Sequence, residues 1–318
     1  MSEDGAALGS RLRERDLSAA PGALNLLEST TSADRTQAKA LLAEIAPAKL
    51  GGEAPAHVIG LTGPPGAGKS TLLSALLEAW RSRGRTVAML AIDPSSRRSG
   101  GSLLGDRARI DFDPADRGVL IRSSAAGERL GGLAWSTRAA AQALAAAFDI
   151  VVIETVGVGQ AETEIADLAD TVVVVAQPGS GDTLQFLKAG IMETPDVLVV
   201  TKSDLGQVAT SARRDLLAAL RSLGRRDTPV LAVSSLAPAS GIDELLQAID
   251  GHRLRLDVNA RRLASRRAGA LRDFTAEHGQ AGLRALGGRR AAEAWLSEQD
   301  PALDGEQLLL ELEQRMSK

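Results

Sequence analysis

A glycine-rich turn is the feature of this sequence whose residue types and spacing most clearly predict chemistry. It runs Gly, four residues, Gly-Lys-Ser, and its members are Gly63, Pro64, Pro65, Gly66, Ala67, Gly68, Lys69 and Ser70. Glycines let a backbone curl so that several N–H groups face one anion, and a following helix adds its positive N-terminus. Lys69 would place a full charge on β- and γ-phosphates, and the Ser70 hydroxyl would ligate Mg²⁺. The spacing predicts a triphosphate cradle rather than a chance glycine-rich turn.

Two carboxylates end apolar runs of strand length, and they are the next candidates. Asp93 follows the run 86–92, and Glu154 closes the run 150–154. Because ligands bind at the carboxyl ends of parallel strands, both acids are expected beside the turn, where Mg²⁺ accepts carboxylates and phosphate oxygens. Gly157 follows closely, and its N–H is placed to contact a γ-phosphate. Taken alone, the two acids would equally be strand-end caps.

A base-binding element is predicted where Thr201-Lys202-Ser203-Asp204 follows another run of strand length. It has the position and nearly the wording of the Asn-Lys-x-Asp element of GTPases. An aspartate there accepts the ring N–H and the amino group of guanine, whereas adenine would leave Asp204 unpaired. The Lys202 stem would cover the base. Three residues after the next run would offer a backbone N–H to the guanine carbonyl: Ser234, Ser235 and Leu236.

Thr201 stands where that element has asparagine. We expect its shorter side chain to lose part of the amide's hydrogen bonding, and so to weaken affinity more than it changes the choice of base. An ordinary turn at the end of a strand is the alternative interpretation of the whole segment.

The elements that must hold these residues alternate between strand and helix. Apolar runs rich in β-branched residues occur at 58–62, 86–92, 150–154, 171–176, 197–201 and 229–233. Helical patterns lie between most of them, at 69–80, 137–148, 184–192 and 209–223. Strands buried on both faces and separated by helices predict an α/β fold with a mostly parallel central sheet.

Helical segments flank this region. Residues 1–52 are predicted as an N-terminal helical extension with Ser32 as a helix N-cap, 53–250 as the nucleotide-binding domain, and 251–318 as a C-terminal helical arm. Pro301 is expected to begin the last helix. The C-terminal arm carries a run of arginines, most simply a solvated helix face and alternatively a protein-binding or dimerising arm; they are Arg261, Arg262, Arg266, Arg267 and Arg272.

Composition excludes several classes of protein. The 318 residues contain no cysteine, which excludes disulfides, thiolate nucleophiles and cysteine-ligated metals, and the three histidines are too scattered to suggest a zinc site. A net charge of −3 argues against a dedicated nucleic-acid binder. With no apolar run near the roughly 20 residues needed to cross a bilayer and no signal-peptide pattern, we expect a cytoplasmic protein without membrane contact.

Together these residues resemble the MeaB/ArgK-type P-loop GTPases, the G-protein chaperones of adenosylcobalamin-dependent acyl-CoA mutases. The stretch Glu-Thr-Val-Gly-Val-Gly-Gln at 154–160 is more specific than the glycine-rich turn, and the resemblance covers essentially the whole chain. The other matching stretches are 63–71, 91–96, 100–106, 130–134, 178–193 and 241–243.

The resemblance implies an activity, ligands and partners. It implies GTP hydrolysis with Mg²⁺ held by Ser70, Asp93, Asp106 and Glu154, nucleotide contacts that reach Thr71, and a homodimer formed partly by the C-terminal helices. It further implies that 178–188, which contains Asp182 and Lys188, is an additional switch loop that signals the nucleotide state to the mutase. Methylmalonyl-CoA mutase is the expected partner, and the output would gate cobalamin loading and protect or reactivate that enzyme.

The mechanism expected from the residues is a slow phosphoryl transfer to water with Lys69, Asp93 and Glu154 around the reacting groups. No glutamine or arginine finger can be assigned, so a partner would accelerate turnover. Three alternatives remain open at this point. They are a metal-insertion maturation GTPase, a transport-associated ATPase or kinase, and a nucleotide-dependent scaffold.

Overall fold

The computed structural model describes residues 4–93, 110–125, 135–155, 161–179 and 195–317. The described residues form a seven-stranded sheet in the order β3-β2-β4-β1-β5-β6-β7, and every pairing in it is parallel. Its strands are β1 His57–Thr62, β2 Val87–Asp93, β3 Val119–Ala125, β4 Ile150–Thr155, β5 Thr171–Ala176, β6 Val197–Val200 and β7 Val230–Ala232. The predicted α/β class with a parallel central sheet is confirmed.

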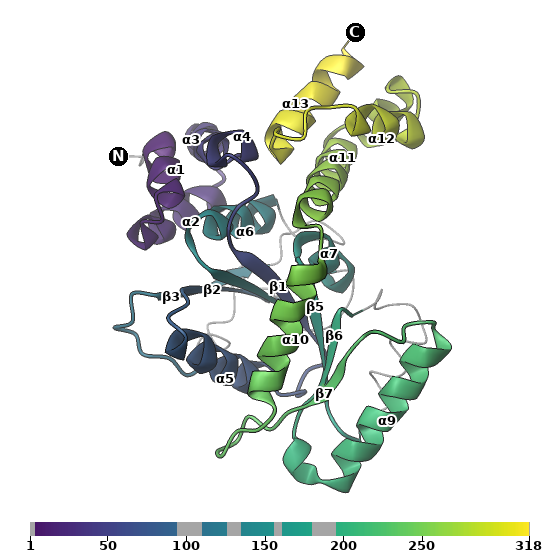
Figure 1. Cartoon of the computed structure of the whole chain (residues 1–318). Helices are drawn as coiled ribbons and strands as arrows, with labels where there is room; N and C mark the ends of the chain where they lie inside the picture. The colour runs from purple at the N-terminus through teal and green to yellow at the C-terminus, as the bar shows by residue number, and fades with distance from the viewer. Residues whose placement is uncertain (1–3, 94–109, 126–134, 156–160, 180–194, 318) are drawn as a thin grey trace, which may run out of the picture. The chain divides into compact units, whose positions relative to one another are not determined.

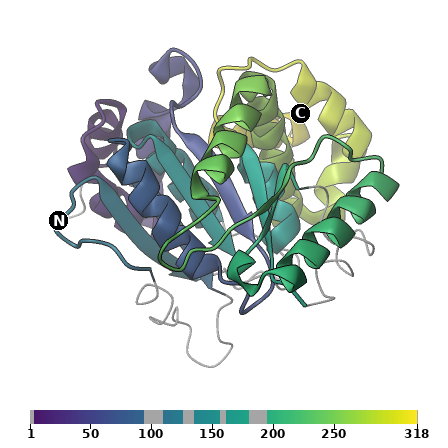
Figure 2. The same cartoon turned by 60° about the horizontal axis from the view of Figure 1, so that its bottom comes forward.

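Two helices cover one face of the sheet. Alternate strand residues such as Ile59, Met89 and Val175 pack against α5 (Lys69–Ser82) and α10 (Ile242–Arg255) in one apolar cluster, and Figure 2 shows both helices in front of the strands. The opposite face packs against α7 (Ala161–Leu168) and α9 (Gln207–Ser222). Because both faces are covered, the central strands are apolar over most of their length, as the sequence runs predict.

One strand, β3, was not expected from the sequence. Among the described strands it pairs with β2 alone, from Val87↔Val119 to Asp93↔Ala125, and it forms an edge of the sheet. Its apolar part is limited to Val119–Ile121, and arginine and serines follow. Because an edge strand has only one neighbour to satisfy, it does not need a long apolar run.

The chain divides into two compact units. The sheet unit comprises 56–141 and 148–256, and the helical unit comprises 1–55, 142–147 and 257–318. The N-terminal helices are α1 Gly5–Arg13, the 3₁₀ turn η1 Leu17–Ala19, α2 Ala20–Glu28, α3 Ser32–Glu44 and α4 Pro47–Leu50. The C-terminal helices are α11 Val258–Ala285, α12 Arg289–Ser297 and α13 Gly305–Met316. Of helix α6 (Trp135–Ala147), labelled in Figure 1, residues 135–141 belong to the sheet unit and residues 142–147 to the helical unit.

Three arginines of α11 are not the solvated face that the sequence predicts. Arg266 makes a bidentate pair with Glu53 at 2.7 and 2.8 Å, and Arg262 donates to Ala54 O at 2.6 Å. Arg267 donates to the carbonyls of Ser297 and Gln299. Guanidinium groups carry several donors in a fixed plane, so these side chains connect α11 to both the N-terminal segment and the turn before α13.

Two helix starts differ from those expected. Thr31, and not Ser32, caps α3, because its hydroxyl accepts from Asp34 N at 3.2 Å. The last helix begins at Gly305 rather than at Pro301. Its N-cap is Asp304, whose carboxylate accepts from Gln307 N at 2.8 Å while the Gln307 side chain accepts from Asp304 N at 2.9 Å. This reciprocal capping box satisfies two donors that the first turn of a helix leaves unpaired.

Asp304 gives a prediction about pH. It is 2% exposed, and burial raises the pKa of its carboxyl above the ordinary value of 3.8. This pKa is higher in the folded chain than in the unfolded one. The free energy of unfolding therefore falls as the pH rises through the range between the two pKa values. We expect Asp304→Asn, which keeps the accepting oxygen without the charge, to melt at a higher temperature than the wild type at pH 7, with the gain vanishing near pH 4.

Calorimetric melting curves at the two pH values test this expectation. Asp257→Asn is the matched control, since Asp257 caps α11 with the same kind of hydrogen bond on an exposed site. Asp304→Ala removes the cap and should cost about 1 kcal/mol. If Asp304→Asn destabilised the chain at pH 7 as much as Asp304→Ala does, the charge would be stabilising and the prediction wrong.

Two of the three histidines meet at the start of the strands, which their sequence separation does not indicate. Thr171 Oγ1 lies 2.8 Å from His57 Nε2 and 2.8 Å from His252 Nδ1, and His252 Nε2 lies 3.2 Å from Asp196 Oδ1. This chain of polar contacts joins β1, β5 and α10 at the amino-terminal ends of the strands, opposite to the glycine-rich turn.

Among the described residues, no helix combines the length and apolar character required to span a bilayer.

Candidate functional site

The glycine-rich turn lies between β1 and α5, as predicted. Gly68 adopts a left-handed conformation (φ 86°) and serves as the N-cap of α5. At Gly63 a Cβ would collide with the carbonyl oxygen of Val175 on the neighbouring strand. Both positions therefore need glycine, one for its backbone angle and one for the close approach of β5. The turn ends in the N-terminus of a 14-residue helix, an arrangement that favours anions.

Lys69 folds back over this turn. Its Nζ donates to Gly63 O at 2.8 Å and to Pro64 O at 3.3 Å, and the residue is only 7% exposed. A buried ammonium is stable when it is hydrogen-bonded, and here the bonding carbonyls belong to the loop itself. The loop thus contains a full positive charge in addition to the helix N-terminus. Ser70 is partly buried in the first turn of α5, and Thr71 beside it is exposed.

One candidate acid lies on β4, which pairs with β1, and the other lies on β2, the next strand beyond β4. Glu154 pairs with Leu61 of β1 and with Ala91 of β2, and it is partly buried. Asp93 is the last residue of β2, two positions beyond Ala91. Both acids therefore lie at the carboxyl edge of the sheet with the glycine-rich turn. Asp106, Gly157, Asp182 and Lys188 lie outside the described residues, so their predicted roles stay predictions.

The 201–204 segment follows β6 at the same edge of the sheet. Thr201 is 3% exposed, and its hydroxyl donates to Ala67 O at 2.6 Å with Ala176 O at 3.1 Å. Lys202 has a left-handed backbone (φ 53°), and its Nζ donates to Gly66 O at 3.2 Å and to Gln177 Oε1 at 3.0 Å. Two consecutive side chains thus hold the glycine-rich turn from the β6 side.

Asp204 lies in the short 3₁₀ turn η3 (Ser203–Leu205) with its side chain exposed. Its Oδ1 accepts from Ser234 Oγ at 3.0 Å, and Ser203 N donates to Val233 O at 3.0 Å. The segment after β7 is therefore fastened to the Asp204 turn. A carboxylate has about four acceptor positions, and this serine bond uses one of them, so the group keeps capacity for a ligand that offers two donors. Ser235 is partly buried and Leu236 is exposed.

Two contacts at this edge were not anticipated from the sequence. Gln177, directly after β5, receives the Lys202 ammonium. Thr155, at the end of β4, donates to Thr62 Oγ1 at 3.1 Å and so joins β4 to the strand that precedes the glycine-rich turn. A glutamine or threonine that ends a strand carries no motif, so no signal in the sequence would have identified either residue.

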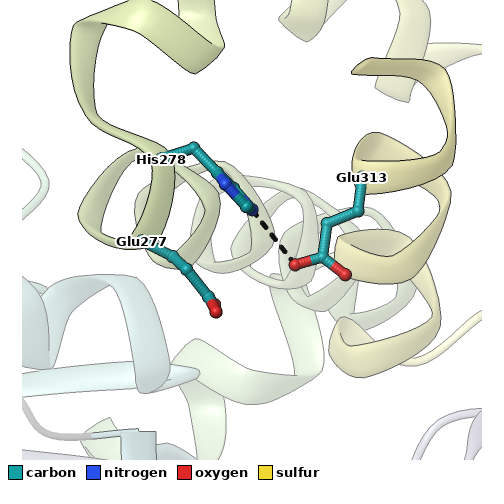
Figure 3. Close-up of side chains that lie close together, drawn as sticks. All are labelled: Glu277, His278 and Glu313. Carbon is teal, nitrogen blue, oxygen red and sulfur yellow. Dashed lines mark hydrogen bonds and ion pairs between the residues drawn. The ribbon is translucent and has the colours of Figure 1, made fainter. Parts of the chain in front are cut away.

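The helical unit contains a separate group of possible metal ligands. Glu277, His278 and Glu313 each offer one ligand atom, and these atoms lie within 4.8 Å of one another. Figure 3 shows His278 of α11 facing Glu313 of α13, with the hydrogen bond of 3.1 Å between them. The His278 ring also lies 4.7 Å from the ring of Phe274. Exposed acids form such groups commonly, and this pair satisfies itself, so we assign it to helix packing.

Comparison with known proteins places the chain among GTPases. A family model described as methylmalonyl Co-A mutase-associated GTPase MeaB matches residues 4–280. A probable GTPase of Mycobacterium tuberculosis is 41% identical over 254 residues, which cover 77% of this chain and 74% of the relative. The mitochondrial methylmalonic aciduria type A homolog of the mouse is 38% identical over 236 residues, covering 70% of this chain and 57% of that protein.

A solved structure resembles the whole chain. It is described as a LAO/AO transport system kinase, and it superposes with a TM-score of 0.65 at 27% identity, covering 100% of this chain and 99% of the other. The family match includes the glycine-rich turn and the 201–204 segment. The similarity therefore extends over both parts of the candidate site.

Proposed function

The chain belongs to the family of methylmalonyl-CoA mutase-associated GTPases, MeaB, and we propose that its GTPase cycle serves as the chaperone switch of an adenosylcobalamin-dependent acyl-CoA mutase. The observation that supports this most is the arrangement of the carboxyl edge of the sheet. There the Lys69 loop after β1 and the exposed Asp204 carboxylate after β6 are joined through Thr201 and Lys202.

In this proposal Lys69 exchanges its bonds to Gly63 O and Pro64 O for oxygens of the β- and γ-phosphates. The phosphates would lie at the N-terminus of α5, where the backbone N–H groups of the loop hold negative charge without having to reorganise. Because the ammonium already lies within the loop, it is positioned for the charge that develops as the γ-phosphoryl group moves to water.

Mg²⁺ is the metal that the donor set fits. The predicted ligands are oxygens only, from a hydroxyl and carboxylates, and Mg²⁺ prefers a few such ligands together with water and phosphate. Of these, Ser70 is the second residue of α5, and Glu154 lies partly buried near the end of β4, which pairs with β1. Bound there with Asp93 and Asp106, the ion would neutralise charge on the β- and γ-phosphates.

Guanine would be selected by Asp204. Its carboxylate accepts from donors, and guanine presents a ring N–H and an amino group side by side, whereas adenine does not. The hydrogen bond from Ser234 to Oδ1 orients the group, and the following residues, Ser235 and Leu236, would offer backbone N–H groups to the base. Lys202, held by Gly66 O and Gln177, would lie along the base with its stem.

Communication with the mutase is the part of the proposal that rests on the family resemblance. We assign it to the segments that contain Gly157, Asp182 and Lys188, which would change between the GTP and GDP states. The domain limits at 52 and 250 and a homodimer formed through the C-terminal helices belong to the same proposal. The output would be the gating of cobalamin loading and the protection of the mutase.

Acceleration by a partner tests this function. We expect a cobalamin-dependent mutase, added at equimolar concentration, to raise the rate of GTP hydrolysis by about tenfold or more, because partners of slow GTPases supply or order groups around the γ-phosphate. Phosphate release is measured with methylmalonyl-CoA, isobutyryl-CoA, ethylmalonyl-CoA and 2-hydroxyisobutyryl-CoA mutases in turn, and the Lys69→Ala variant serves as the blank for contaminating activity.

Other outcomes would favour other functions. If none of these mutases changed the rate, the chain would be a GTPase with a different partner, and the chaperone proposal would fail. The name of the similar solved structure raises a kinase as the second candidate. Transfer of the labelled γ-phosphate to a protein, in place of its release as inorganic phosphate, would support that alternative.

A further inference from the structure

Thr201 stands at the position where the Asn-Lys-x-Asp element has an amide, and its surroundings show what it does instead. The residue follows β6 and is 3% exposed. Its hydroxyl oxygen lies 2.6 Å from Ala67 O, in the glycine-rich turn 134 residues earlier, and 3.1 Å from Ala176 O. If Gly68 carried a Cβ, that atom would be in van der Waals contact with both the hydroxyl and the methyl group of Thr201.

A threonine hydroxyl has a single proton. Ala176 O already receives the Thr201 backbone N–H at 2.9 Å, and the shorter side-chain contact is the one to Ala67 O. The proton is therefore used within the protein, and the side chain has almost no exposed surface that a ligand could contact. Lys202 and Asp204, by contrast, are exposed.

The chemistry of the base makes this difference measurable. Guanine carries acceptors at N7 and O6 on one edge and donors at N1 and the 2-amino group on another. An asparagine amide has two N–H donors, so it can hold a loop carbonyl and also donate to N7. A threonine that donates to Ala67 O has no proton left for N7.

We infer that Thr201 is a positioning residue for the phosphate loop, and that this pocket holds guanine without a hydrogen bond to N7. This inference rests on the proposed GTP site. Asp204 then binds the donor edge of the base, and N7 receives no hydrogen bond, while Thr201 and Lys202 fix the carbonyls of Ala67 and Gly66, so that the N–H groups of the loop keep facing the phosphates.

The test compares GTP with 7-deaza-GTP, in which a C–H group replaces N7. We expect the wild-type chain to bind the two nucleotides with dissociation constants within threefold of each other. Thr201→Val keeps the shape but removes the hydroxyl, leaving a buried carbonyl unsatisfied. This variant should weaken the binding of both nucleotides by the same factor, about tenfold. Thr201→Ser should restore both dissociation constants to within threefold of the wild type.

Thr275→Val is the matched control. It also removes a hydroxyl that donates to a backbone carbonyl, Leu271 O at 2.7 Å, but it lies in the helical unit, and nucleotide binding should be unchanged. If the wild-type chain bound GTP more than threefold tighter than 7-deaza-GTP, that result alone would overturn the inference. So would a Thr201→Val chain that loses affinity for GTP but not for 7-deaza-GTP. A wild-type chain that binds neither nucleotide would instead remove the proposed function itself.

Discussion

GTP hydrolysis by the Lys69→Ala variant is expected to fall to about one hundredth of the wild-type rate or less. A single donor that faces the charge developing in the transition state typically raises the rate by about a hundredfold or more. Lys69 is the cation that the structure places inside the glycine-rich turn, with Nζ 2.8 Å from Gly63 O. Without it, the N–H groups of the loop and Mg²⁺ would have to hold the β- and γ-phosphates with no ammonium inside the turn. Phosphate release at saturating GTP and Mg²⁺ measures the effect.

Lys49→Ala controls for the loss of a lysine as such. Lys49 lies in the helical unit, is half exposed and pairs with Glu44 at 3.5 Å, so its removal should leave hydrolysis unchanged. Circular dichroism of the Lys69→Ala chain verifies that it folds, because the side chain also satisfies two loop carbonyls. Undiminished hydrolysis by a folded Lys69→Ala variant would refute the assignment of the phosphate loop.

The second large effect concerns the choice of base. Asp204→Asn is expected to lose about a hundredfold or more in affinity for GTP and to gain affinity for xanthosine triphosphate. The carboxylate can accept from both donors of guanine, and hydrogen bonds to a charged group contribute about 1.5–3 kcal/mol each. Xanthine has a carbonyl where guanine has the amino group, and an asparagine side chain can donate to a carbonyl while still accepting from the ring N–H.

Competition against labelled GDP measures both affinities, with ATP as a further competitor that the wild-type chain should reject. The hydrogen bond from Ser234 Oγ at 3.0 Å can persist, because the asparagine retains an accepting oxygen. Asp215→Asn makes the same change at an exposed position of α9 and should leave the preference intact. Equal binding of GTP and ATP by the wild-type chain would defeat the role assigned to Asp204.

Much of this molecule could be predicted because the signals are local. The apolar runs of six strands and the spacing from Gly63 to Ser70 each span a few residues, and the strand–turn–helix order around the turn follows from them. The strand β3 was missed because an edge strand needs few apolar residues. The cap of α3 was misplaced by one residue because Thr31 and Ser32 are both good N-caps, and only the contact with Asp34 N distinguishes them.

The arginine run of α11 shows a different reason for failure. Five arginines in one helix match a solvated face, and composition contains nothing that indicates which of them find partners. The structure brings Glu53 and the carbonyl of Ala54, more than 200 residues away in sequence, to Arg266 and Arg262. The predicted roles of Asp106, Gly157, Asp182 and Lys188 lie outside the described residues and stay predictions.

The sequence by itself determined six of the seven described strands, the phosphate turn, and the position of the acids and the base-binding segment at the ends of strands. These depend on residues close together in the chain. Only the tertiary structure decided that Thr201 serves the turn rather than the base, and that one hydroxyl at Thr171 joins two histidines. A single proton can be given to only one acceptor at a time, and which acceptor lies within 3 Å depends on how distant strands pack, not on neighbours in sequence.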